Sequence, residues 1–115
     1  MIYYVYIMAN PRYTVLYTGV TNDIHQRSFE HKIKSNKKSF TTRYNCSILV
    51  YYEEFGDITE AIHREKQLKK YKRVWKEELI TKMNAGWKDL SEGWFSPKEL
   101  EFGKSLNSQN ASDLI

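Results

Sequence analysis

The N-terminal part of the chain alternates short apolar runs with turn residues. Residues 2–8 are apolar, aromatic and β-branched, which favours a strand. The tripeptide NPR at 10–12 interrupts this run, because proline fixes its own φ and has no N–H to donate. A second apolar run covers 15–20. The short connection predicts an antiparallel hairpin, and a turn centred between positions 11 and 12 places Tyr6 directly opposite Tyr17.

Helical and extended patterns alternate along the rest of the chain. A helix is expected to begin at the capping residues Thr21-Asn22-Asp23, a buried strand follows at SILVYY, and Ser96-Pro97 begins a short tail helix. Helices are expected over 22–34, 58–71 and 75–83, and an apolar stripe with helical spacing supports the second of them. Together these elements predict an α+β fold, in which a small three-stranded antiparallel sheet (hairpin plus one strand) packs with three to four helices.

The length of 115 residues suits one domain with a modest core. We predict a main domain over 1–90, a docked C-terminal extension over 91–102 and a Ser/Asn-rich disordered tail over 103–115. Because the sequence shows no signal-peptide pattern and no apolar run of membrane-spanning length, we expect a cytoplasmic protein without membrane contact. The single cysteine, Cys46, excludes a disulfide framework.

Arg27 and His31 are four residues apart in the predicted helix over 22–34, so they share one helix face. Beside the hairpin tyrosines, this polar pair is expected to face into the molecule. An alternative for Arg27 is a surface ion pair with Glu30 or Asp23. The alternative for His31 is a structural hydrogen bond.

Glu65 falls on the apolar stripe of the helix predicted over 58–71, between Ala61 and Leu68. A carboxylate at a core-facing position is costly unless something compensates its charge. A divalent metal, an arginine or a tyrosine hydroxyl would compensate it. The structural alternative is a salt bridge to a buried arginine or to Lys69, four residues later.

The net charge of +4 is unevenly distributed. Residues 22–45 carry six Lys or Arg against two acids, and residues 61–85 carry eight against three, whereas 46–60 carries four acids and no Lys or Arg. Phosphate backbones are bound by such basic clusters, although solvated helix faces have the same composition. The aromatic residues Phe40 and Tyr44 are candidates for base stacking. The candidate nucleic-acid-binding residues are Lys37, Lys38, Arg43, Lys69, Lys72 and Arg73.

An ordered set of motifs runs through the same segments. It consists of Tyr4-Val5-Tyr6, Tyr17-Thr18-Gly19, Arg27 and His31, Arg64-Glu65-Lys66, and Asn84. Over residues 1–90 this set resembles the GIY-YIG nuclease domain, and most of all the small stand-alone proteins of that superfamily. Tyr4 and Thr18 stand where the family motifs have glycine and isoleucine, and both are backbone or packing positions.

The resemblance implies a metal-dependent endonuclease that hydrolyses phosphodiester bonds of DNA, or of structured or single-stranded nucleic acid. Glu65 would bind Mg²⁺ or Mn²⁺, and Arg27 would hold the scissile phosphate. Tyr6 and Tyr17 would position or deprotonate the attacking water, with one of them as general base. His31 would assist proton transfer or contact the phosphate, and Asn84 matches the late asparagine of the superfamily.

Larger relatives carry separate DNA-binding domains, so a protein partner that supplies target specificity is a further expectation. One alternative is a nucleic-acid-binding module without catalysis, in which the tyrosine, arginine and glutamate set is structural. Another is a protein–protein adaptor that uses the aromatic surface near 87–102.

Overall fold

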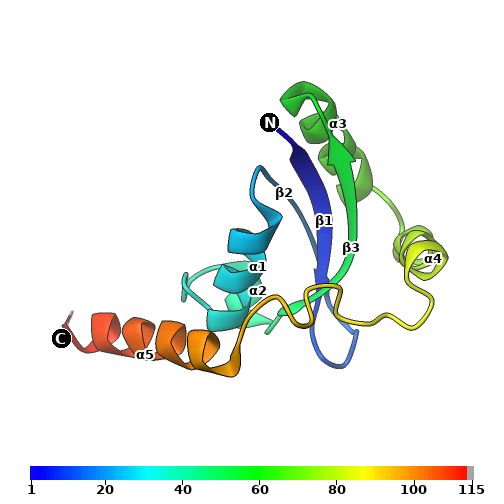
Figure 1. Cartoon of the computed structure of the whole chain (residues 1–115). Helices are drawn as coiled ribbons and strands as arrows, with labels where there is room; N and C mark the ends of the chain where they lie inside the picture. Colours follow the sequence, from blue (N-terminus) through cyan, green and yellow to red (C-terminus); the bar gives the residue numbers. More distant parts are fainter. Residues whose placement is uncertain (114–115) are drawn as a thin grey trace.

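The computed structural model describes residues 1–113, and the side chains of residues 1–107. A three-stranded antiparallel sheet, ordered β2-β1-β3, consists of β1 (Tyr3–Ala9), β2 (Leu16–Thr21) and β3 (Ile48–Phe55). The helices are α1 (Ile24–Ile33), α2 (Phe40–Arg43), α3 (Ile58–Lys69), α4 (Arg73–Met83) and α5 (Pro97–Asp113). Figure 1 shows α1 on one side of the sheet and α3 and α4 on the other. The predicted α+β class and three-stranded antiparallel sheet are confirmed.

The hairpin register differs by two residues from the prediction, because Tyr6 pairs with Gly19 and not with Tyr17. The connecting loop is longer than a tight turn, since the side-chain Oδ1 of Asn10 accepts hydrogen bonds from two backbone N–H groups of the loop, each at 2.8 Å. A shift of two residues leaves every side chain on its face of the sheet. Tyr6 and Tyr17 are therefore diagonal neighbours on one face, with ring centroids 6.3 Å apart.

The central strand β1 is buried on both faces and divides its side chains between two small cores. Side chains alternate between the faces of a strand, so odd and even positions separate. The odd positions Val5, Ile7 and Ala9 pack with residues of α3 and α4, namely Ala61, Leu68 and Ile80. The even positions pack on the α1 side, where Tyr6 and Met8 join Ile24, Cys46 and Leu49.

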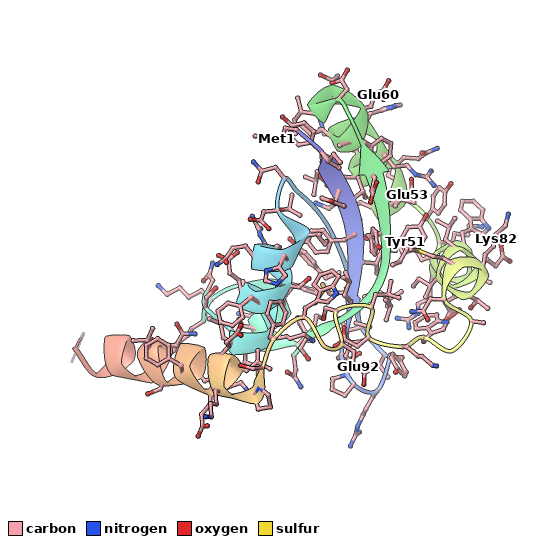
Figure 2. All side chains as sticks on the ribbon, in the orientation of Figure 1. Met1, Tyr51, Glu53, Glu60, Lys82 and Glu92 are labelled. Atoms are coloured by element: carbon pink, nitrogen blue, oxygen red, sulfur yellow. The ribbon has the colours of Figure 1, made fainter. Side chains whose placement is uncertain are left out.

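A partly buried ion pair holds α3 against β3. Arg64 donates from Nε to Oε1 of Glu53 and from Nη2 to Oε2, each at 3.0 Å, and the hydroxyl of Tyr51 donates to the same carboxylate. Figure 2 shows Tyr51 and Glu53 projecting from β3 towards the α3 and α4 side. Glu65 follows Arg64 directly, so this pair fixes the rotation of α3 that turns Glu65 towards the sheet.

The C-terminal helix α5 begins at Pro97, as predicted, but continues to Asp113. Residues 103–113 are therefore helical and not the disordered tail that their composition predicted, and residues 114–115 lie outside the described residues. Gly103 explains part of this, because it lets α5 approach α1 so closely that a Cβ there would lie 2.9 Å from Ile33. The division into a main domain and a docked extension stays a prediction.

Candidate active site

A hollow of about 410 Å³ opens between β2, α1 and the segment around α2. Three of the predicted catalytic residues, Tyr17, Arg27 and His31, line it. The remaining lining residues are Glu30, Ser35, Asn36, Ser39, Phe40, Thr41 and Thr42. Two faces predicted from sequence alone, that of the tyrosine hairpin and that of the Arg27–His31 helix, thus meet at one place.

Below the hollow, a chain of hydrogen bonds links three elements. The Tyr6 hydroxyl lies 3.0 Å from His31 Nε2, and His31 Nδ1 lies 2.9 Å from the Thr41 hydroxyl. Both ring nitrogens of His31 are therefore occupied, which fixes the orientation of the imidazole. The Tyr17 ring packs against the same imidazole, with ring centroids 5.9 Å apart.

The backbone at Gly19 makes room for the Tyr6 ring. Gly19 pairs with Tyr6 across the hairpin, and a Cβ at this position would lie 2.6 Å from the Tyr6 Cζ and hydroxyl oxygen. Glycine is therefore required here by close approach, and φ at this residue is not the reason. The glycine of the second strand motif is thus needed to position the tyrosine of the first.

Burial controls the protonation of the Tyr6–His31 pair. Burial, assisted by the positive charge of Arg27, lowers the pKa of His31 to about 4. Burial also raises the pKa of Tyr6 above its ordinary value; Tyr17 adds to this shift, and Arg27 opposes it. At neutral pH the pair is consequently a neutral imidazole beside a neutral phenol.

Arg27 forms the surface ion pair that the sequence left open as an alternative. Its Nε lies 3.3 Å from Oε1 of Glu30, one helical turn later. The arginine side chain is nevertheless 43% exposed and lies on the wall of the hollow. A pair this exposed contributes little to stability, so Arg27 can exchange Glu30 for a phosphate at little cost.

Glu65 is buried, as its position on the apolar stripe predicted, with 9% of its surface exposed. Its Oε1 lies 2.6 Å from Nζ of Lys69, which is the salt bridge considered as a structural alternative. Glu65 does not line the hollow, since α3 packs on the opposite face of the sheet. The sheet lies between them, with β2 and β3 as its two edge strands.

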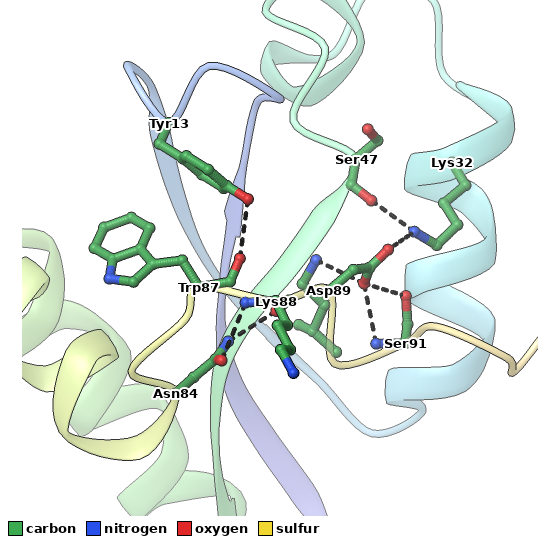
Figure 3. A network of polar contacts seen from close by, with 9 residues as sticks. Tyr13, Lys32, Ser47, Asn84, Trp87, Lys88, Asp89 and Ser91 are labelled. Atoms are coloured by element: carbon green, nitrogen blue, oxygen red, sulfur yellow. Dashed lines mark hydrogen bonds and ion pairs between the residues drawn. The ribbon is translucent and has the colours of Figure 1, made fainter.

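Asn84 lies apart from the hollow, and its amide is used within the fold. Its Nδ2 donates to the carbonyls of Val50 (3.1 Å) and Lys88 (2.8 Å), and its Oδ1 accepts from the Lys88 N–H at 3.1 Å. Figure 3 shows the two bonds between Asn84 and Lys88, just after α4 ends. Asn84 therefore joins the end of α4 to β3 through its side-chain amide.

The predicted nucleic-acid-binding residues divide into two groups. Lys37, Lys38 and Arg43 are exposed on the segment that forms one wall of the hollow. The others lie where α3 ends and α4 begins. There Lys69 pairs with Glu65, Lys72 lies 5.5 Å from the Trp75 ring centroid, and Arg73 donates to two carbonyls of the β1–β2 loop.

Sequence reasoning missed Thr41 and the short helix α2 that positions it, because residues 35–45 lack a clear periodicity. A signal was present, since Ser39 caps α2 by accepting a hydrogen bond from the Thr42 N–H. Phe40 is 45% exposed, between Tyr17 (centroids 5.9 Å apart) and Tyr44 (4.6 Å).

Among the described residues, no three His, Cys, Asp or Glu side chains gather closely enough to hold a metal ion jointly. No helix within residues 1–113 combines the length and apolar character needed to cross a membrane.

Comparison with known proteins adds the family context. Residues 2–78 match the GIY-YIG catalytic domain. The chain is 35% identical over 78 residues to the UPF0213 protein SH2523 of Staphylococcus haemolyticus, an alignment that covers 68% of this chain and 93% of that protein. It is also similar to the solution NMR structure of the UPF0213 protein BH0048 from Bacillus halodurans, at 28% identity and a TM-score of 0.49, covering 81% of this chain and 98% of that one.

Proposed function

Because this chain belongs to the GIY-YIG catalytic-domain family, which is of nuclease type, we propose that it hydrolyses phosphodiester bonds of nucleic acid, DNA foremost, with Mg²⁺ or Mn²⁺. The observation that carries the proposal is the hollow in which Tyr17, Arg27 and His31 converge. These groups supply phosphate recognition and proton handling at one place.

The hollow suggests separate roles for the two tyrosines. Tyr17 lines the hollow and can orient the attacking water, whereas Tyr6 is 1% exposed and hydrogen-bonded to His31. Since burial raises the pKa of Tyr6, its phenolate is disfavoured. We therefore propose that Tyr6 positions His31. Because its pKa is lowered, His31 stays neutral and can relay a proton between its two hydrogen-bonded ring nitrogens, while the Arg27 guanidinium holds the scissile phosphate.

Glu65 suits a hard divalent cation. Its carboxylate is buried, and Lys69, whose side chain is 53% exposed, compensates the charge. Mg²⁺ binds through one or two carboxylates and keeps several waters, so a single protein ligand is sufficient. When bound, the ion supplies neutralisation of charge on the phosphate and activation of water. Since Glu65 and Arg27 lie on opposite faces of the sheet, we propose that the ion at Glu65 binds a phosphate next to the one that Arg27 holds, on a strand that passes an edge of the sheet.

The proposed function is tested by cleavage assays in Mg²⁺ or Mn²⁺. The substrates are labelled DNA and RNA, including branched, nicked and single-stranded forms. Wild type is compared with Glu65→Gln and Arg27→Gln, and with Glu92→Gln, an exposed glutamate, as matched control. We expect cleavage to fall at least 100-fold in the first two, as for loss of a charge-stabilising group, and to persist in the control. Equal residual cleavage in all four proteins would refute the proposal.

A second candidate is a nucleic-acid-binding module without catalysis. It is favoured by the engagement of Glu65 with Lys69 and of the Asn84 amide with backbone groups, because both then serve the fold. Binding that needs no metal and yields no product on any substrate would favour it. Both candidate functions are compatible with a protein partner that supplies target specificity. If the purified protein is inactive and cell extract restores its cleavage, such a partner is present in the extract.

A further inference from the structure

The turn between α3 and α4 carries a run of positive charge without acids. Residues 66–76 contain six Lys or Arg and no Asp or Glu. Figure 1 shows α3 and α4 on the side of the sheet away from α1, so this run is separate from the hollow. Like charges held close together are unfavourable unless an anion joins them.

Lys76 lies in the first turn of α4. The residue is partly buried, and within the described part of the chain its ammonium group forms neither a hydrogen bond nor an ion pair. Burial, followed by the charges of Arg73 and Lys69, lowers the pKa of Lys76. Three cations from two helices are therefore within electrostatic reach of one another.

The neighbours of Lys76 differ in what they offer an anion. Arg73 uses its guanidinium on the carbonyls of Tyr13 and Thr14, and its Nε lies 3.4 Å from Glu77. Arg73 thus contributes charge but few free donors. Lys69 contacts Glu65, yet 53% of its side chain is exposed, so its ammonium can turn towards a second anion.

We propose that Lys69 and Lys76 form a second phosphate-binding site, beside Glu65, for a backbone phosphate of the nucleic acid. The identity of this ligand rests on the proposed function. The surroundings favour nucleic acid, because Trp75, next to Lys76, is 45% exposed and offers a base-stacking surface within the basic run. The site extends the contact surface beyond the hollow and onto the other face of the sheet.

Lys69 connects this phosphate site with the carboxylate of Glu65. Its ammonium serves one anion at a time, Glu65 in this structure and the phosphate in the complex. When Lys69 turns to the phosphate, the Glu65 carboxylate is left free for a divalent cation. Binding of the backbone and binding of the cation therefore favour one another.

Fluorescence anisotropy with a labelled 20-nucleotide single strand and the matching duplex tests the site, in EDTA and between 50 and 200 mM salt. Lys76→Gln is expected to weaken binding several-fold and to lower the salt slope by about 0.7 for the single strand and 0.9 for the duplex, the loss of one phosphate contact. Lys104→Gln, which removes an exposed lysine of α5, keeps the wild-type slope. Lys76→Arg retains the charge and keeps most of the affinity.

Equal affinity and slope for Lys76→Gln and Lys104→Gln would overturn the site, provided that circular dichroism shows both variants folded. If inorganic phosphate binds at Lys76 but the oligonucleotides do not, the assignment of this site to a nucleic-acid backbone is overturned. Cleavage assays on the same proteins separate the two proposals. If Lys76→Gln cleaves as well as wild type, the phosphate site is refuted and the proposed nuclease activity stands. If binding depends on Lys76 but no protein cleaves, the phosphate site is supported and the nuclease activity is refuted.

Discussion

At the residue scale, the contact between Gly19 and Tyr6 makes the site sensitive to a single methyl group. Gly19→Ala would place a Cβ 2.6 Å from the phenol ring, which is held in place by its bond to His31. We expect a loss of about 1–3 kcal/mol in the free energy of unfolding, as for overpacking of a core, measured by urea denaturation. Gly56→Ala is the matched control, since nothing lies within 4 Å of its Cβ. Equal stabilities of the two variants would contradict the contact.

The buried His31 makes stability depend on pH. Its pKa in the folded protein is about 4, below the value of 6.5 for an exposed histidine, so between these values the unfolded chain takes up the proton. Stability therefore falls as the pH is lowered through this window, by up to about 1.4 kcal/mol per pH unit and about 3 kcal/mol in all. Urea unfolding of wild type and His31→Gln between pH 7 and 4.5 measures this, and parallel curves would exclude a buried neutral imidazole.

At the element scale, the segment after α4 acts as a strap between the sheet and α1. Asp89 accepts from Lys32 of α1, from the Leu49 N–H of β3 at 3.3 Å and from the Ser91 hydroxyl at 2.7 Å (Figure 3). Burial would raise the pKa of Asp89, but the hydrogen bonds from Lys32 and Ser91 outweigh it and lower that pKa. The strap therefore fixes the helix that carries Arg27.

Asp89→Asn tests this strap. The amide cannot compensate the Lys32 charge, so we expect a loss of about 1–3 kcal/mol in unfolding free energy and faster hydrogen exchange at Leu49 and Leu90, whose N–H groups lie at this junction. Glu92→Gln removes an exposed acid of the same segment and serves as control. Unchanged exchange in Asp89→Asn would show that the strap does not depend on this carboxylate.

At the scale of the whole molecule, the candidate groups lie on two faces of one thin sheet. Tyr17, Arg27 and His31 lie on the α1 side, and Glu65 with its lysines lies on the α3 side. A nucleic acid that contacts both sides must pass one of the two edges of the sheet, β2 or β3. Binding of such a ligand is then coupled to binding of the cation at Glu65, because the cation and the nucleic-acid backbone bind to one composite surface.

This arrangement predicts reciprocal coupling. Mn²⁺ should strengthen binding of a phosphorothioate oligonucleotide by a factor within about 5–150, and the oligonucleotide should strengthen Mn²⁺ binding by the same factor. Anisotropy gives the first quantity, and electron paramagnetic resonance of free Mn²⁺ gives the second. Glu65→Gln should abolish both effects, whereas Glu92→Gln should leave them intact. Independent binding of the two ligands would contradict a site that spans the sheet edge.

Much of this protein follows from local periodicity. The period of two kept Tyr6 and Tyr17 on one sheet face although the predicted register was wrong by two residues. The helical period placed Arg27 with His31 on one wall and buried Glu65. These features depend on residues close in sequence, so the sequence determined them by itself.

Contacts between distant segments were decided by the tertiary structure alone. Gly103 lets α5 pack closely on α1, and the backbone carbonyl of Val50 accepts a hydrogen bond from the Asn84 amide. The placement of Glu65 across the sheet from the hollow belongs to the same class. Periodicity states which side of an element is buried, but only packing decides which other element covers it and which polar groups meet there.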